Sequence, residues 1–526
     1  MSTPTKGPGV SYAEAPPSLP PHTRTLSSTH SSGAHPVELT EEDEKQKALE
    51  EAPFTYKLIA LTCALLLSAG SHFVVHSLNT LKATLKAELP IDNAQYGVLQ
   101  STNSLINSII PLFGGILMDR FGTGAGSILC TGLILLGSGL TAIAAEARSY
   151  TLMLAARVLF GMGSGTIVVA QESILSTWFR GKGLAMTIGL QIATSRLFGF
   201  LAHASALPIK MATGHYGTVL WVAFALCLSS FTLNLLYIHI HRLSLRQHAL
   251  AIQSKVRKPH RRFSLSALLY IPGTFWLIPL TIALLSGVWM PFLSIVSDYM
   301  TVHFGSTDLI AAWTSSVSLA VPVVLSPFCG YFFDRYGRRG PVVLLSALLL
   351  VISISLLGWT YAHPLIGLTL FSFSLTLAPV ALTTSVPLVL PAKLVGTGLG
   401  IYKCAHSSGI AFVDVLVGSL QDGHGGSYDP VLIFLLCLAC VSSLSGLAYW
   451  LFDGLFLRGL LDAGPEVRAA LMEERRRKET EEEEEERASR ISGIKRKKNV
   501  TSIIGTMLMM SFLVLCWITY LVHIIR

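Results

Sequence analysis

Arg196 stands near the centre of an apolar run, GLQIATSRLFGF, at residues 189–200. A guanidinium inside a membrane costs several kcal/mol unless it faces a cavity or has a partner. Small residues lie at helical spacing from it and would share its helix face: Gly189, Ala193 and Gly199. A small-residue face with one cation can line a passage and bind a carboxylate through two parallel hydrogen bonds. The alternative is a structural ion pair with a buried acid such as Asp414.

Three more ionisable residues lie in one apolar segment near the C-terminal end of the chain: Lys403, His406 and Asp414. Lys403 and His406 are three positions apart and therefore share a helix face. A second cation opposite Arg196 would suit an anionic or zwitterionic cargo. In the alternative, these residues form a packing network in which Asp414 has a structural role and neutralises Lys403.

His72 and His76 form an i, i+4 pair in the first apolar segment. They would titrate in an acidic compartment, or they line a cavity or pack in the core. No third ligand lies near them in sequence, so we expect no metal site. We interpret Arg157 as a structural residue that holds neighbouring helices. No nucleophile–base–acid arrangement, phosphate loop or cofactor signature occurs, so we expect neither enzymatic activity nor a cofactor.

The amino-acid composition indicates that these ionisable residues lie in a membrane protein. Only 13% of the 526 residues are Asp, Glu, Lys or Arg, while 51% are hydrophobic. A soluble protein carries about 25% charged residues. The net charge of +8 does not indicate nucleic-acid binding, because the basic residues lie in loops between apolar segments, as expected on the cytosolic side of a membrane. We therefore expect an all-α protein embedded in a lipid bilayer.

Twelve apolar segments are long enough to span a bilayer as helices. They are residues 56–80, 94–118, 124–145, 150–173, 183–207, 216–240, 274–298, 309–333, 341–361, 364–390, 394–420 and 431–456. The predicted parts are a disordered cytosolic tail (1–52), an N-terminal six-helix half (53–242), a basic cytosolic loop (243–267), a C-terminal six-helix half (268–458), a charged cytosolic tail (459–500) and an extra membrane helix (501–526).

The motif G-x-x-x-D-R-[FY]-G follows the second span of each half. Its members are Gly115, Asp119, Arg120 and Gly122 in the first copy, and Gly330, Asp334, Arg335 and Gly337, followed by Arg338, in the second. Two copies in register indicate two parallel repeats. An Asp at a helix end can bond to backbone donors of a neighbouring helix and hold an Arg. We expect a polar clasp that breaks and re-forms as two halves rock; a turn with topology-setting charges is the simpler alternative.

Through this repeated motif the chain resembles the major facilitator superfamily. The resemblance covers about residues 54–458. The segment RVLFGMGSG at 157–165 also fits the fourth-helix pattern of this superfamily. The resemblance implies two six-helix halves, twelve membrane helices in all, that rock around a site at the midplane. The segment at 501–526 would then be a thirteenth helix.

The stretch from Arg157 to Arg196 is more specific, because it resembles the lysosomal dipeptide transporter family. This resemblance implies facilitated export of dipeptides from an acidic organelle, a glycosylated single-span partner protein, and a role for Arg196 in receiving the cargo's carboxylate. The family's fourth-helix acid, which holds the peptide amine, corresponds to Gly165, and Glu172 is a substitute two turns further on. A tenth-helix aromatic residue corresponds to Thr383, and first-helix positions correspond to His72 and His76.

We therefore predict a secondary transporter, a uniporter, for small carboxylate-bearing solutes. Its predicted cargo-binding residues are Arg196, Lys403, His406, His72, His76, Thr383 and Glu172. The lysosomal or vacuolar membrane is implied by the resemblance, with the plasma membrane as the alternative. Two rival functions stay open: transport of organic anions or monocarboxylates, because the amine-binding acid is missing, and a non-transporting receptor or scaffold with the same fold.

Overall fold

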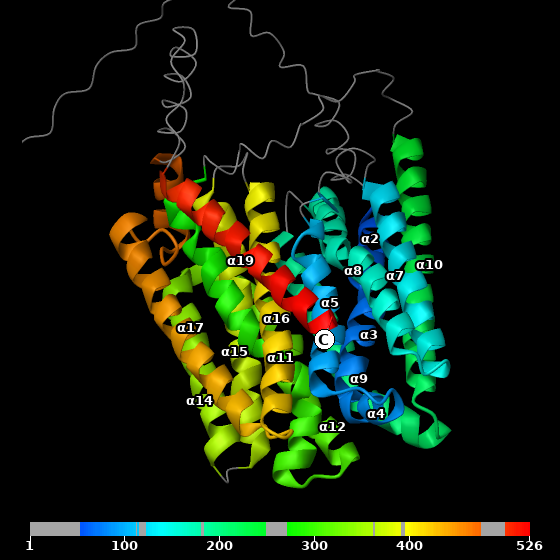
Figure 1. The fold of residues 1–526 in the computed structure, drawn as a ribbon. Coiled ribbons are helices and arrows are strands. Elements are labelled where there is room, and N and C mark those ends of the chain that lie inside the picture. Colours follow the sequence, from blue (N-terminus) through cyan, green and yellow to red (C-terminus); the bar gives the residue numbers. More distant parts are fainter. Residues whose placement is uncertain are drawn as a thin grey trace, which may run out of the picture.

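The computed structural model describes residues 53–111, 113–114, 123–179, 184–248, 271–360, 363–390, 395–474 and 500–525. Within these ranges the regular structure is helical, and no strand occurs (Figure 1). Ten helical stretches of the described residues are long and apolar enough to cross a membrane. The prediction of an all-α membrane protein is confirmed.

The helices form two bodies, each around its own apolar core. The first body contains α2 (Phe54–Leu66), α3 (Ala69–Thr80), α4 (Lys82–Glu88), α5 (Asn93–Asn107), α7 (Thr123–Glu146), α8 (Tyr150–Phe179), α9 (Leu184–Thr213) and α10 (Gly217–His248). The second contains η3 (Gly273–Phe275), α11 (Leu277–Phe304), α12 (Asp308–Ser316), η4 (Val317–Leu319), α13 (Ala320–Tyr336), α14 (Arg339–Trp359), α15 (Pro364–Val389), α16 (Val395–Gly423) and α17 (Asp429–Phe456). We call these bodies the N half and the C half.

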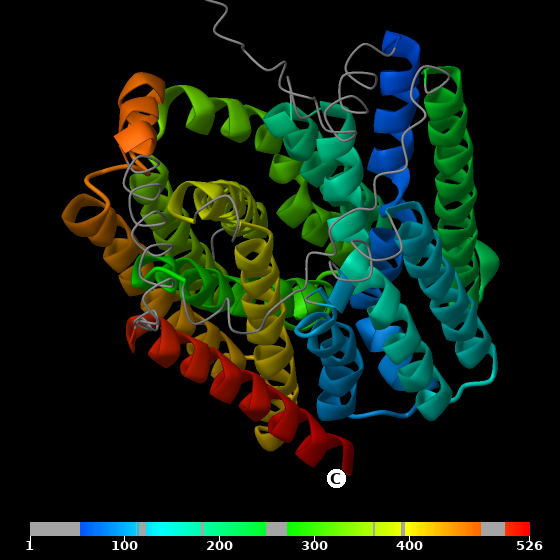
Figure 2. The same cartoon turned by 90° about the horizontal axis from the view of Figure 1, so that it is seen from above.

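The two halves lie side by side and meet along two seams (Figure 2). One seam joins α5 to α16, and the other joins α9 to α12 and α13. Small residues bring backbones together at both seams: a Cβ on Gly97 of α5 would lie 2.7 Å from the Asp414 carbonyl oxygen, and one on Gly189 would lie 3.0 Å from the Cα of Pro327. Close approach of this kind is how helices associate in lipid.

Three predicted spans are interrupted within the described residues, and the second, predicted over 94–118, has a turn at Ser108–Ile109 after α5. The first, predicted as one helix over 56–80, is divided at Leu67–Ser68 into α2 and α3. The eighth, predicted over 309–333, is divided by the 3-10 turn η4 into α12 and α13. The turns at these interruptions lie close to His72 in the first span and to Ser315 in the eighth, and both residues reappear at the site below.

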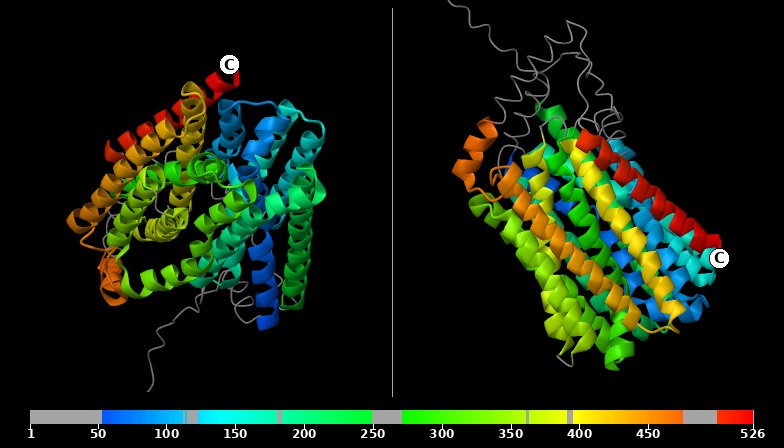
Figure 3. Two further views of the ribbon diagram at one scale, coloured as in Figure 1. Left: turned by 90° about the horizontal axis from the view of Figure 1, so that it is seen from below. Right: turned by 60° about the vertical axis from the view of Figure 1, so that its left-hand side comes forward.

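A further helix, α19 (Val500–Ile525), crosses the outside of the bundle obliquely (Figure 1). It packs against α16 and α5, as the view from below and the side view both show (Figure 3). The prediction of an extra C-terminal membrane helix is confirmed.

We call the end of the bundle that carries α4, α12 and the α16–α17 turn the outer end, because the sequence predicts these turns to be non-cytosolic. The inner end carries the α13–α14 turn and the segment after α17.

Candidate functional site

Arg196 lies near the middle of α9, where its side chain is partly exposed inside the membrane-spanning bundle. Among the described residues, no hydrogen bond or ion pair to its guanidinium occurs. The residue one turn away is Gly199, whose missing side chain leaves room for the His76 ring: a Cβ there would lie 2.7 Å from the ring's Cδ2. An unpaired guanidinium at this depth needs water or a ligand to be tolerated.

The residues that act electrostatically on Arg196 come from two helices. They are His72 and His76 of α3, and Tyr402 and His406 of α16. Thr383 of α15 donates a hydrogen bond of 3.1 Å to the Tyr402 hydroxyl. The structure therefore brings five of the predicted cargo-binding residues, Arg196, His72, His76, His406 and Thr383, into one region between the halves.

His203, which lies on α9 two turns beyond Arg196, is not among the cargo-binding residues predicted from the sequence. Its ring is fully buried, 5.4 Å from the His76 ring, and its Nδ1 lies 3.1 Å from the Thr80 hydroxyl and 3.4 Å from the Ser315 hydroxyl. His76 Nδ1 and His203 Nε2 are buried without a hydrogen-bond partner. His203 was on the same helix face as Arg196 in the sequence, and that spacing was the available signal.

Lys403 and Glu172 form an ion pair across the two halves. The Lys403 Nζ lies 2.8 Å from the Glu172 Oε1, and both side chains are partly exposed, at 20% and 25%. The alternative in which Asp414 neutralises Lys403 is therefore wrong, because the acid at Lys403 is Glu172. Lys403 lies in the part of α16 nearer the inner end.

Asp414 also does not pair with Arg196. It is 6% exposed, and the charged residue that acts on it is Arg157. Arg157 is 1% exposed, its Nε and Nη1 are buried without a partner, and its guanidinium lies 5.3 Å from the centre of the Phe160 ring. The two residues act on each other electrostatically from α8 and α16, and the structural role predicted for both stays a prediction.

Gly165, the position of the family's amine-binding acid, faces α5 in this chain. A Cβ there would lie 2.5 Å from the Asn107 side-chain oxygen. Ser164 beside it donates a hydrogen bond of 2.7 Å to Asn103. The amide side chains of α5 therefore occupy the space that an acidic side chain at position 165 would need.

The first copy of the repeated motif (Gly115, Asp119, Arg120 and Gly122) lies outside the described residues. The second copy (Gly330, Asp334, Arg335, Gly337 and Arg338) forms the end of α13 and the turn into α14. Gly337 and Arg338 both have left-handed backbone, with φ of 71° and 50°. The glycine therefore closes the turn, as the motif predicts.

The acid that bonds to the start of α14 is not Asp334. Asp462, in the segment after α17, accepts a hydrogen bond of 2.8 Å from the Gly340 amide. Arg468 of the same segment donates to the backbone oxygens of Phe333 and Asp334, at 3.1 and 2.8 Å. This clasp joins elements of the C half, and sequence reasoning missed it because Asp462 lies more than a hundred residues from the motif.

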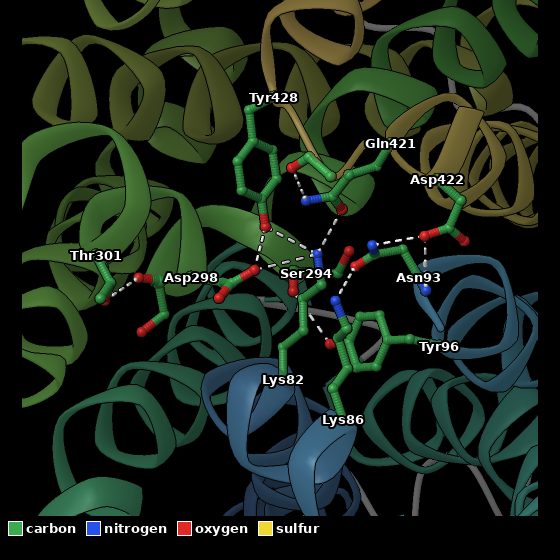
Figure 4. A network of polar contacts seen from close by, with 12 residues as sticks. Lys82, Lys86, Asn93, Tyr96, Ser294, Asp298, Thr301, Gln421, Asp422 and Tyr428 are labelled. Atoms are coloured by element: carbon green, nitrogen blue, oxygen red, sulfur yellow. Dashed lines mark hydrogen bonds and ion pairs between the residues drawn. The ribbon is translucent and has the colours of Figure 1, made fainter. Parts of the chain in front are cut away.

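A second polar network, also missed from the sequence, joins the halves at the outer end (Figure 4). Lys82 of the N half is 2% exposed on its side chain and contacts three residues of the C half. Its Nζ lies 2.9 Å from the Gln421 side-chain oxygen, 2.8 Å from the Tyr428 hydroxyl and 3.4 Å from the Asp298 carboxylate. The Tyr428 hydroxyl in turn donates to Asp298.

Asp422 completes this outer-end network from the end of α16. Its carboxylate accepts hydrogen bonds from the Asn93 amide, the Asn93 side chain and the Ala94 amide, at 3.2, 2.7 and 2.6 Å. These donors are the first turn of α5, where backbone N–H groups lack intrahelical partners and a negative charge is favourable. The outer-end network therefore consists of Lys82, Asn93, Asp298, Gln421, Asp422 and Tyr428.

Burial lowers the pKa of Lys82 to about 8, against the opposing effect of the Asp298 carboxylate. Burial thus has the larger effect on the pKa, so keeping the ammonium charged at this position costs free energy. Such a cost is tolerated because three acceptors surround the Nζ atom.

The sequence profile of the Major Facilitator Superfamily matches residues 61–296 and 277–525. The chain belongs to the Major Facilitator Superfamily. It is a multi-pass membrane transporter with the fold of that superfamily and an additional helix, α19.

The curated relatives of this facilitator include the lysosomal dipeptide transporter MFSD1 of Danio rerio, 26% identical over 409 residues, which are 76% of this chain and 87% of that protein. Among solved structures, the nucleoside transporter NupG has a TM-score of 0.58 at 12% identity, over 75% of this chain and 100% of NupG. The peptide transporter POT has a TM-score of 0.56 at 12% identity, over 75% of this chain and 94% of POT. These two structures support the fold alone.

Proposed function

We propose that this facilitator moves small carboxylate-bearing solutes, dipeptides first among them, across an organelle membrane by alternating access, as a uniporter. The names of its curated relatives support dipeptides as cargo and the lysosomal or vacuolar membrane as the location. Few acidic residues lie in its membrane segments, so the proposal needs no proton carrier.

The observation that carries the proposal is the unpaired guanidinium of Arg196 at the middle of α9. A cation that lies between two halves, partly exposed and with no partner among the described residues, is a receptor for an anionic group. Lys403 and His406 lie opposite it on α16, where the Lys403 ammonium is held by Glu172. A carboxylate between them would contact both halves.

Glu172 is the candidate receptor for the amine of a dipeptide. In the empty site it holds the Lys403 ammonium at 2.8 Å. Both side chains remain partly exposed, so the ammonium of a cargo molecule has access to the same carboxylate. Cargo binding would then exchange one ammonium for another at Glu172, and the bond between the halves would be released.

The second candidate is transport of organic anions or monocarboxylates. It is favoured by Gly165, whose environment of Asn103 and Asn107 contains no acid. If Lys403 keeps Glu172 occupied, the free charges that face the cargo are positive, and a simple organic anion satisfies them.

The test is uptake into liposomes that contain the purified full-length protein. Dipeptides, single amino acids and organic acids are compared, each with and without an ionophore that collapses the proton gradient. We expect dipeptide uptake to persist when the proton gradient is collapsed. In Arg196→Ala we expect uptake to fall at least about tenfold, because a bidentate charged contact with the carboxylate is lost. Arg458→Ala, an exposed arginine in the segment after α17, is the matched control and should transport normally.

Organic-acid uptake without dipeptide uptake would favour the second candidate. Uptake that stops when the gradient is collapsed would contradict the uniporter. Folded protein that binds a solute but moves none would favour the receptor function predicted as a rival.

A further inference from the structure

Helix α19 contacts both halves of the transporter at once. On the N-half side, the Tyr520 hydroxyl lies 2.7 Å from the Thr102 hydroxyl of α5. On the C-half side, the Cys516 thiol lies 3.5 Å from the Ser408 carbonyl oxygen of α16, and the Phe512 and Phe412 rings are 5.7 Å apart. These residues follow one face of α19 from its middle to its outer end.

This face of α19 is buried while the opposite face is open. Tyr520 is 7% exposed and Cys516 is 2% exposed, whereas Val514 and Ile518 are 54% and 53% exposed. A small apolar core lies beneath α19 and is shared by three helices: Val98 and Leu105 of α5, Ala411 and Val415 of α16, and Cys516 and Tyr520 of α19. The helix therefore covers the line where the two halves meet.

The covered stretch is the one where α5 and α16 touch through their backbones. A Cβ on Gly97, next to Val98, would lie 2.7 Å from the carbonyl oxygen of Asp414, next to Val415. The outer-end network closes the same seam immediately beyond this stretch. A state open at the outer end requires α5 and α16 to separate here.

The inner-end part of α19 is attached to the C half. A side chain on Gly505 would overlap the indole of Trp276, which lies between η3 and α11. If α19 stays with the C half when the seam opens, the hydroxyl contact between Tyr520 and Thr102 must break. Within lipid, packing and hydrogen bonds between helices are not replaced by water, so their loss is a cost.

We propose that α19 is a strap that holds the outer half of the α5–α16 seam closed and so favours the outer-closed state of the transporter. This inference rests on the alternating access proposed above. Its key contact is the hydrogen bond between Tyr520 and Thr102, which joins the strap to the half that moves away.

The test measures the separation of the two halves at the outer end, with no cargo present. Spin labels are placed at Ala212→Cys in the N half and His424→Cys in the C half, both exposed, with exposed Cys437 and Cys440 changed to Ser. Distances are measured by electron–electron double resonance on full-length protein in lipid nanodiscs. The long-distance population reports the outer-open state.

Tyr520→Phe should raise the ratio of outer-open to outer-closed protein about threefold, as expected for loss of one interhelical hydrogen bond in a membrane. Thr102→Val should do the same, and the double variant should not add to either. Thr519→Val is the matched control: its hydroxyl bonds only to Leu515 of its own helix, at 2.8 Å, so the ratio should stay as in the parent.

Lys82→Ala breaks the outer-end network independently of α19. It therefore distinguishes a failure of the strap proposal from a failure of the alternating-access proposal. If Lys82→Ala opens the outer end but Tyr520→Phe does no more than Thr519→Val, the strap is overturned while alternating access stands. If no variant produces a second distance, the rocking of the halves itself is overturned, and the strap with it.

Discussion

At the scale of single residues, the charges inside the bundle fall into paired and unpaired groups. Lys403 is neutralised by Glu172 and Lys82 by Asp298, each across the two halves. Arg157 and Asp414 act on each other inside the bundle, whereas Arg196 faces only uncharged or histidine neighbours. An unpaired charge in a membrane is costly, and Arg196, unlike the fully buried Arg157, is partly exposed between the halves, where a ligand could reach it.

Glu172→Gln is the residue-scale prediction. If Glu172 receives the cargo amine, the variant should raise the KM for a dipeptide about tenfold, as expected for loss of a charge-assisted hydrogen bond. The measurement is uptake of a dipeptide beside its N-acetylated form, which carries the same carboxylate and no ammonium. The acetylated cargo should be transported equally by both proteins; an equal loss for the two cargos would show that Glu172 acts only through Lys403.

At the scale of elements, the seam between α5 and α16 depends on the absence of side chains. A Cβ at Gly418 of α16 would overlap the Asn93 carbonyl oxygen of α5, and Gly97 of α5 faces the backbone of Asp414 in the same way. Backbone atoms cannot rotate away as a side-chain end can. These two glycines therefore set how closely the halves approach at the outer end.

Gly418→Ala should push the seam apart and favour the outer-open state, since overpacking costs about 1–3 kcal/mol when the neighbours cannot move. The matched variant is Gly423→Ala at the end of the same helix, where a Cβ would meet nothing within 4 Å. The distances between the two outer-end spin labels should lengthen for Gly418→Ala and stay unchanged for Gly423→Ala. A response of both variants would point to a change in α16 itself.

At the scale of the whole molecule, the outer end is closed by contacts between the halves, while the clasp at the inner end lies within the C half. Asp422 caps α5 across the seam and Lys82 reaches three residues on the other side. Within the part of the chain that the structure describes, the clasp of Asp462 and Arg468 joins the α13–α14 turn to the segment after α17. The equilibrium between states therefore depends in part on these outer-end contacts, while the Lys403–Glu172 ion pair joins the halves nearer the inner end.

This equilibrium should respond to alkaline pH through Lys82. The closed state holds its pKa at about 8, whereas a lysine in water has a pKa of about 10.4. Between these values the open state binds more protons, so rising pH favours the closed state; below about pH 8 both states keep the proton and this group adds no pH dependence.

Outer-end distances should therefore shorten when the pH is raised from about 7.5 to about 9.5, within the window between the two pKa values. Lys82→Met keeps a stem of similar length without the amine and should not respond over this range. Lengthening of the distances with pH in the parent protein would mean that the lost ion pair with Asp298 outweighs the relief of burial.

The sequence by itself determined the membrane helices, the repeat and the central arginine. The free energy of transferring a segment from water to lipid depends on that segment alone. Apolar runs of spanning length can therefore be found from the sequence. A charge within such a run, as at Arg196, signals a function without knowledge of its neighbours. The extra helix α19 was predicted on the same ground.

Only the tertiary structure decided which charges meet. Glu172 rather than Asp414 neutralises Lys403, Asp462 rather than Asp334 bonds to the start of α14, and His203 joins His76 across two helices. Each pair is far apart in the chain, and ionic or hydrogen-bond partners are selected by distance in space. The breaks at Leu67–Ser68 and η4, and the position of α19 over the seam, likewise follow from packing between helices, which no single segment encodes.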